Sequence, residues 1–238
     1  LVGYNNYGHI INSYAEGNIS GNEYVGGLVG RNRRDSSIIE NSWASGQVDG
    51  SERVGGLSGE NADGTINKSY ATGNVIGTGD RLGGLVGNSN EGTIIESYAT
   101  GNITGHADDS QKIGGLVGYA YDNDFITNSY ATGNVSGNDE IGGLIGYLYT
   151  DGVLTNSYSI GSINATLDNR KGGLVGYSVS STTITDNYWD TETSGLAISD
   201  GGEGKTTVEL QDPATFSTWD TNIWSLISGS YPFLQWEN

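Results

Sequence analysis

The sequence of 238 residues contains no cysteine, no methionine and only two prolines. Without cysteine it can form neither a disulfide nor a thiolate metal site, and it lacks the composition of collagen or of a disordered Pro/Gly-rich chain. It also lacks a run of about 18 apolar residues, so no membrane insertion is expected. Basic residues are scarce, with 10 Lys and Arg against 28 Asp and Glu. The formal charge of −18 repels phosphates, so nucleic acid is not an expected partner.

Glycine, in contrast, is abundant. Forty glycines make up about 17% of the chain, against roughly 7% in average proteins. Because the low proline content argues against disorder, we expect these glycines to serve turns and close backbone packing. The chain opens partway through a repeat at Leu1, so we expect a fragment or a processed product.

A unit of about 29 residues recurs along residues 1–190. Each full copy contains a Gly-Gly-Leu core, which begins at Gly26, Gly55, Gly83, Gly114, Gly142 and Gly172. Each reads as three short extended runs, such as residues 113–120, 125–132 and 134–136, separated by turn residues. Such a unit cannot close a core alone, whereas stacked units can. The repeat predicts an all-β fold, a β-solenoid (β-helix) of about seven coils with three short strands per coil. A β-propeller, whose blades need about 40 residues, is the rival.

Equivalent positions of stacked units form columns, and three columns are aliphatic. They contain Ile10, Ile39, Ile66, Ile94, Ile126, Leu154 and Ile184; then Ile19, Val48, Val75, Ile103, Val135 and Ile163; and then Leu28, Leu57, Leu85, Leu116, Leu144 and Leu174. We expect these columns to form the three inner walls of the coils.

A fourth column is aromatic, and we call it the aromatic ladder. It contains Tyr14, Trp43, Tyr70, Tyr98, Tyr130, Tyr158 and Tyr188. Small Ser and Ala residues flank nearly every ring, which favours small residues inside and the ring outside, provided that a bend separates the ring from the aliphatic column. Strict alternation would instead place the ring inside. An outward ladder could stack on glycans.

A fifth column is mostly charged. It consists of Tyr24, Arg53, Arg81, Lys112 and Glu140, with Arg170 near the same place in the next unit. We interpret it as a solvated row of turn residues, with a strip for an acidic ligand as the alternative.

Residues 191–238 depart from the repeat and are rich in aromatic side chains. Because the last coil of a solenoid exposes strand edges and an open core, we expect a C-terminal capping segment here. Residues 206–219 predict a short helix, with Thr207 as candidate N-cap. The alternative is a Trp/Tyr surface that binds sugars.

Residues that carry chemistry are few. There is no catalytic motif with histidine or cysteine and no phosphate-binding loop. Acidic turns favour a Ca²⁺ site as the only cofactor hypothesis, with the candidate ligands Asp63, Asp122, Asp124 and Asp151. Turn formation alone also explains these acids. Five sequons, at Asn18, Asn67, Asn102, Asn134 and Asn164, are candidate glycosylation sites.

The repeats resemble the GLUG repeat family, whose signature joins a Gly-Gly-Leu-Val-Gly core to a segment like NSYATGNVSG. The core is GGLVG at Gly26, Gly83, Gly114 and Gly172, GGLIG at Gly142 and GGLSG at Gly55, and the resemblance covers about four fifths of the chain. Such repeats occur in large bacterial and archaeal surface proteins, including adhesin-like and hemagglutinin-like proteins and non-catalytic parts of some immunoglobulin A peptidases. The resemblance implies an extracellular setting, secreted or on the cell surface, and brings no catalytic residues.

These observations predict a non-catalytic surface protein that serves adhesion, binding a host or neighbouring-cell glycan or protein through the solenoid face. The alternative is a structural spacer that assembles with other copies of itself. A carbohydrate-active enzyme is the third hypothesis, because carboxylates are abundant.

Overall fold

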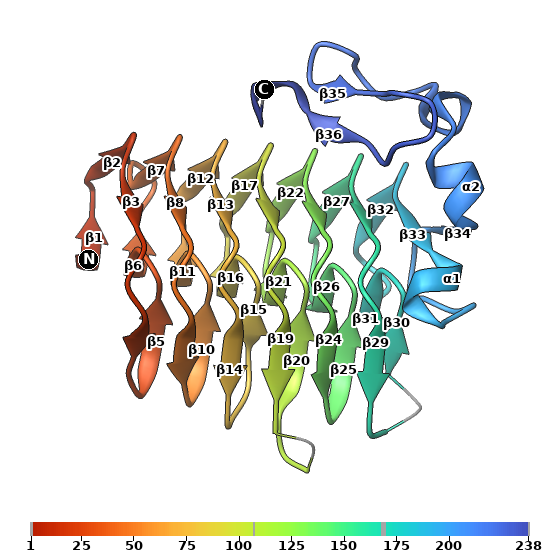
Figure 1. Cartoon of the computed structure of the whole chain (residues 1–238). Helices are drawn as coiled ribbons and strands as arrows, with labels where there is room; N and C mark the ends of the chain where they lie inside the picture. Colours follow the sequence, from red (N-terminus) through yellow and green to blue (C-terminus); the bar gives the residue numbers. More distant parts are fainter. Residues whose placement is uncertain (1, 107, 168–169, 238) are drawn as a thin grey trace.

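A computed structural model of the chain describes residues 2–106, 108–167 and 170–237. Its strands stack in parallel, coil upon coil, and form a β-solenoid of about seven coils (Figure 1). Equivalent residues of successive units pair across the coils, as Ile66 does with Ile94 and Tyr70 with Tyr98. The predicted all-β solenoid is therefore confirmed.

Five parallel sheets run along the solenoid, and we number them in chain order. Sheet 1 contains β1 (Val2–Asn6), β6 (Val29–Arg33), β11 (Ser58–Ala62), β16 (Val86–Asn90), β21 (Val117–Tyr121), β26 (Ile145–Leu148) and β31 (Val175–Ser178). Sheet 2 contains β2 (His9–Ile11), β7 (Ile38–Glu40), β12 (Thr65–Asn67), β17 (Thr93–Ile95), β22 (Phe125–Thr127), β27 (Val153–Thr155) and β32 (Thr183–Thr185). Sheet 3 contains β3 (Tyr14–Ala15), β8 (Trp43–Ala44), β13 (Tyr70–Ala71), β18 (Tyr98–Ala99), β23 (Tyr130–Ala131), β28 (Tyr158–Ser159) and β33 (Tyr188–Asp190). Sheet 4 contains β4 (Ile19–Ser20), β9 (Val48–Gly50), β14 (Val75–Gly77), β19 (Ile103–Gly105), β24 (Val135–Gly137) and β29 (Ile163–Ala165). Sheet 5 contains β5 (Glu23–Gly26), β10 (Glu52–Gly55), β15 (Leu82–Gly83), β20 (Gln111–Gly114), β25 (Asp139–Gly142) and β30 (Lys171–Gly172).

A full coil thus has five strands, and the prediction of three is wrong. The predicted run 113–120 divides into β20 and β21, and the run 125–132 divides into β22 and β23. The second break occurs at a left-handed residue in every coil, with φ between 46° and 55°: Asn12, Asn41, Lys68, Glu96, Asn128, Asn156 and Asp186. Asparagine tolerates this conformation better than most residues. This bend is the one that an outward aromatic ladder requires.

Serine side chains replace the backbone hydrogen bonds that the bend interrupts. The backbone N–H of Ser69 donates to Oγ of Ser97 at 3.2 Å, and that of Ser97 donates to Oγ of Ser129 at 3.3 Å. Each hydroxyl in turn donates to the carbonyl two residues earlier, as Ser97 does to Ile95 at 2.7 Å. These serines are fully buried, so the polar groups at the bend are satisfied without water.

Inside the solenoid, the buried apolar side chains form two cores rather than one. The predicted isoleucine and leucine columns share the larger core with the alanine column of sheet 3. The column of Val48 instead lines a smaller core, opposite a column that the sequence analysis did not select: Val25, Val54, Leu82, Ile113 and Ile141.

Glycine permits close approach of the backbones between coils. A Cβ on Gly84 would lie 2.0 Å from the carbonyl oxygen of Gly115 and 2.9 Å from Cβ of Ala99. A Cβ on Gly87 would lie 2.5 Å from the backbone nitrogen of Val54. No side chain fits at these distances, so the repeated glycines are structural.

Residues 191–237 first cover the last coil. After α1 (Thr191–Ser194), the carbonyl of Ile198 and the hydroxyl of Ser199 accept hydrogen bonds from the backbone N–H groups of Gly173 and Val175. Strand β34 (Glu203–Lys205) then extends sheet 3 beside β33.

The chain next runs back along the outside of sheet 3 (Figure 1). We call residues 206–237 the return segment. It contains α2 (Thr207–Leu210), the 3₁₀ helix η1 (Pro213–Phe216), the antiparallel pair β35 (Trp224–Ser225) and β36 (Phe233–Leu234), and the 3₁₀ helix η2 (Gln235–Glu237). Thr206, rather than the predicted Thr207, caps α2 through a capping box with Glu209. No helix in the described ranges is long and apolar enough to cross a membrane.

Candidate binding surface

The rings of the aromatic ladder stack on one another along the solenoid. From Tyr14 to Tyr158, successive ring centroids lie 4.8–5.8 Å apart with interplanar angles of 6–10°. The residue after each ring is buried, and the alanines at this position line the larger core. The rings therefore point outward, the direction that the sequence analysis favoured.

The return segment covers the C-terminal half of this ladder. Tyr130, Tyr158 and Tyr188 are only 6%, 1% and 8% exposed, whereas Tyr14 is 57% exposed. Every covered hydroxyl donates to the return segment: Tyr130 to Oε2 of Glu237 at 2.9 Å, Tyr158 to the carbonyl of Pro232 at 2.5 Å and Tyr188 to the carbonyl of Thr215 at 3.2 Å.

Indole groups of the return segment bond to the bend residues of sheet 3. The Nε1–H groups of three tryptophans donate in this way: Trp219 to the carbonyl of Asp186, Trp224 to Oδ1 of Asn128 and Trp236 to the carbonyl of Glu96. The contact buries large aromatic side chains and satisfies their polar atoms. The return segment and sheet 3 therefore form an intramolecular interface.

The ladder is consequently a poor platform for sugars. Stacking on a sugar needs a free ring face, but each inner ring has its faces covered by its neighbours. Three of the seven predicted ring positions are also buried. The prediction that the ladder binds a ligand is wrong for these three positions. At the uncovered positions after Tyr14, the ladder presents ring edges rather than ring faces.

The predicted calcium ligands do not form a site. Asp63, Asp122 and Asp151 occupy left-handed turn positions with φ of 58°, 48° and 56°, whereas Asp124 points inward and is fully buried. Burial raises the pKa of Asp124 well above its usual range. Within the described ranges, no three His, Asp or Glu side chains are placed to share a metal ion. These four residues therefore do not fit a Ca²⁺ site.

The predicted glycosylation sites differ in exposure. Asn18, Asn102, Asn134 and Asn164 are exposed, whereas Asn67 is half-buried and its amide donates to Glu40. Oδ1 of Asn102 accepts the backbone N–H of Asn134 at 2.9 Å. Glycosylation of these residues stays a prediction.

The charged column forms ion pairs between coils. Its members Tyr24, Arg53, Arg81, Lys112 and Glu140 all have left-handed φ values of 54–65°. Arg81 pairs with Glu52 at 3.2 Å and Lys112 with Glu140 at 3.2 Å, and Arg170 bonds Asp139 and Glu140. The row is therefore half-buried and charge-compensated, and it is not a plain strip of cations.

A second aromatic cluster, which the sequence analysis missed, lies beside this row on the outer face of sheet 1. We call it the tyrosine patch: Tyr119, Tyr121, Tyr147, Tyr149 and Tyr177. Most of its ring pairs are tilted or edge-on, at 46–83°. Only Tyr121 and Tyr149 stack, with centroids 5.2 Å apart and an interplanar angle of 6°.

The patch has free ring surface and neutral hydroxyls. Tyr121 and Tyr177 are each 36% exposed. The cations of Arg81 and Lys112 lie 5.5 and 5.8 Å from the ring centre of Tyr119, which fixes that ring. Burial raises the pKa of Tyr119 well above the phenol value, so its hydroxyl stays protonated at physiological pH. The signal in the sequence is that a tyrosine directly follows each of three successive GGLxG cores, at Tyr119, Tyr147 and Tyr177.

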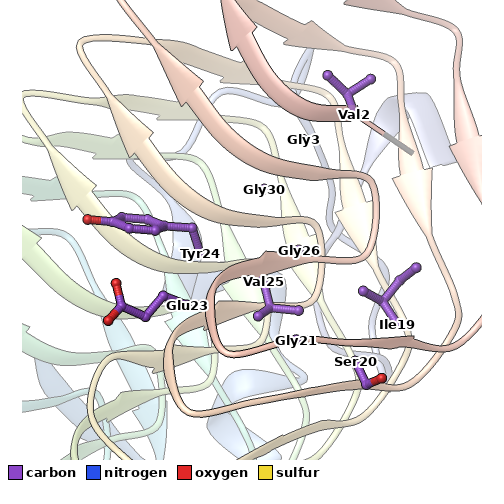
Figure 2. A pocket seen from close by; sticks show the side chains of 10 residues that line it. All are labelled: Val2, Gly3, Ile19, Ser20, Gly21, Glu23, Tyr24, Val25, Gly26 and Gly30. Atoms are coloured by element: carbon purple, nitrogen blue, oxygen red, sulfur yellow. The ribbon is translucent and has the colours of Figure 1, made fainter.

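Two hollows at the first coil are of a different kind. One, of about 360 Å³, lies between Val2, Ile19 and Val25 (Figure 2). The other lies beside Ile10 and Leu28. Their counterparts in later coils are covered by the preceding coil, so these hollows are the uncovered ends of the two cores.

Comparison with known families identifies the repeat. The GLUG motif matches five consecutive segments, residues 21–49, 50–76, 78–104, 109–136 and 137–164, which together make up more than half of the chain. The chain belongs to the GLUG motif family. No curated protein and no solved structure matched it.

The GLUG motif corresponds to one coil of the solenoid. Each match begins shortly before a strand of sheet 5 and ends in or near sheet 4 of the next coil. Within it, the Gly-Gly-Leu core supplies the close backbone contact and the Asn-Ser-Tyr segment supplies the bend, the serine bond and the ladder ring. The tyrosine patch is not part of this shared pattern, because Arg31, Glu60 and Asn88 occupy the column of Tyr119 in earlier coils.

Proposed function

We propose that this chain is a non-catalytic module of an extracellular protein, secreted or on the cell surface, that adheres to a glycan of a host or neighbouring cell. A GLUG β-solenoid fits a surface repeat protein of adhesin type. The observation that carries the glycan assignment is the tyrosine patch, in which tilted rings leave ring faces accessible beside charged and amide side chains.

Several features support a binding role over catalysis. Enzymatic cleavage of a glycan needs two carboxyl groups facing one bond. The acids next to the patch, Asp139 and Glu140, are instead 1% and 2% exposed and are bonded to Arg170. Tyrosine rings with polar neighbours are suited to holding a sugar without reacting with it.

A glycan array with the full chain tests the proposal. We expect the double variant Tyr121→Ala/Tyr149→Ala to lose at least about tenfold in affinity, because each aromatic contact contributes on the order of 1 kcal/mol. The matched control is Tyr4→Ala, a 49% exposed tyrosine of sheet 1. Tyr4 belongs to the column of Tyr119 and lies four coils before it. Equal binding by the wild-type chain and the double variant would contradict the proposal.

A structural spacer is the second candidate. The serine bonds and the stacked ladder rings continue through successive coils, as a stiff rod requires. A wild-type chain that binds no glycan on the array would favour this candidate, with other copies of the chain as partners.

A further inference from the structure

A hollow of about 270 Å³ opens where the tyrosine patch ends. It is bounded by Tyr119 and Tyr121 on one side, by Arg53 and Arg81 along the charged column, and by Glu60 and Asn88 on sheet 1. Register explains its position: Asn88 and Asn90 pair with Tyr119 and Tyr121 of the next coil, so the large rings give way to smaller side chains here.

Asn88 is the unusual residue of this hollow. It is 7% exposed, yet its side-chain amide forms no hydrogen bond with any other residue in the described ranges. The amide atoms are open to solvent through the hollow and are not fully buried unsatisfied groups. Because this amide lines the hollow, a bound molecule can supply its partner.

The hollow offers both hydrogen-bond donors and acceptors. Glu60 accepts from Nε of Arg31 at 2.8 Å through Oε2, which leaves Oε1 without a bond to a described residue. Arg81 donates to Glu52 through Nη1 alone. The amide of Asn88 can both donate and accept. This set matches hydroxyl groups, since each hydroxyl also donates one bond and accepts others.

One aromatic face borders these polar groups. Tyr149 covers one face of Tyr121. The coil on the other side carries Asn90 in register with Tyr121 and has no ring there. Tyr121 therefore turns its uncovered face toward the hollow, and the apolar C–H face of a sugar ring can pack on it.

The charges of the hollow are balanced. The guanidinium groups of Arg31, Arg53 and Arg81 pair with the carboxylates of Glu23, Glu52 and Glu60, which is three cations against three anions. The whole chain carries a formal charge of −18. A polyanionic ligand would therefore be repelled by the net charge of the chain, and the hollow has no unpaired cation to offset that repulsion.

The geometry points to a subsite for one neutral pyranose unit of a glycan, with Tyr121 under the ring and Asn88, Glu60 and Arg81 bonded to its hydroxyls. This inference rests on the proposed function and assigns its ligand class and a specific position. Asn88 is the residue that tests the subsite separately from the proposed function. No described side chain depends on Asn88 for a hydrogen bond, so its substitution should leave the fold intact.

Calorimetric titration of the full chain tests the subsite. The probes are linear neutral hexasaccharides of glucose, mannose, galactose and N-acetylglucosamine, and a galacturonate hexamer of equal length. We expect a neutral hexasaccharide to bind, and Asn88→Ala to weaken that binding about tenfold at an unchanged melting temperature. Asn22→Ala, an exposed turn asparagine, is the control and should bind normally.

The other outcomes are distinguishable. Neutral binding that is lost in Tyr121→Ala/Tyr149→Ala but unchanged in Asn88→Ala would overturn the subsite and leave the proposed function standing. Tighter binding of the galacturonate hexamer would overturn the neutral class. An absence of binding to every oligosaccharide would remove the proposed function together with the subsite.

Discussion

Single polar residues inside the solenoid bond to their counterparts in the next coil. Asn5 donates to Asn32 at 2.7 Å, and Asn32 donates to Asn61 at 2.8 Å. Farther along, the register partner of Ser89 is Ala120, and Ser89 instead donates to Oδ1 of Asp124 at 2.6 Å. Oδ2 of Asp124, however, is buried and has no hydrogen-bond partner. An ionised carboxylate is therefore poorly satisfied at this position.

The substitution Asp124→Asn should stabilise the fold at neutral pH. The folded-state pKa of Asp124 is raised by burial, so the stability that its neutral form contributes is complete below the unfolded pKa of about 4 and declines as the pH rises toward the folded pKa. Asparagine is neutral throughout. We expect a gain of about 1 kcal/mol or more at pH 8 and little change at pH 4, measured by chemical denaturation. Asp151→Asn, in an exposed turn, is the control. A loss of stability that is equal at both pH values would contradict this account.

At the scale of elements, the return segment is tied to the end of the solenoid at Asp190. This fully buried carboxylate caps α1 and accepts hydroxyl bonds from Thr207 at 2.7 Å and Tyr231 at 2.6 Å. Burial alone would raise the pKa of Asp190, but these hydrogen bonds outweigh it and lower the pKa below the usual aspartate value. The ionised form therefore holds the segment in place.

Acid should loosen the return segment through Asp190. Since its folded pKa is depressed, its contribution is present above the unfolded pKa of about 4 and is lost as the pH falls through the folded pKa. We expect Asp190→Asn to weaken the docked state by about 1 kcal/mol at pH 7 and to remove part of its acid sensitivity. Tryptophan fluorescence and limited proteolysis of residues 206–237 report docking. Glu16→Gln, an exposed acid, is the control, and an acid transition identical in Asp190→Asn and wild type would refute the role of Asp190.

The sequence could predict whatever repeats from coil to coil. The columns of Ile94, Leu85 and Tyr98 gave the stacking and the inward faces, because each interaction joins equivalent positions. The return segment was predicted only as a cap, since its contacts, such as Trp236 with Glu96, join residues 140 positions apart and follow no period. Two strands of each coil were missed because the breaks between them, such as the bend at Asn128, fall inside runs that read as continuous. The second core was missed because the column of Val54 lies in the same run as the Gly-Gly-Leu core. The tyrosine patch was missed because it is confined to a few coils.

At the scale of the whole molecule, the solenoid displays two aromatic surfaces with different roles. In the aromatic ladder on sheet 3, the ring faces stack on one another, and the return segment packs against the ladder. The tyrosine patch on sheet 1 keeps ring faces accessible and lies beside paired charges and the hollow at Asn88. The strongly negative chain keeps the rod soluble and away from polyanions. We expect binding to occur at the patch alone.

Hydroxyl-radical footprinting of the full chain, with and without the best-binding array glycan, tests this claim most directly. The method reports how accessible each aromatic side chain is. The account predicts that bound glycan protects Tyr121, Tyr149 and Tyr177, while Tyr14 and Trp43 of the ladder keep their reactivity. Protection of Tyr14 and Trp43 with an unchanged tyrosine patch would contradict it.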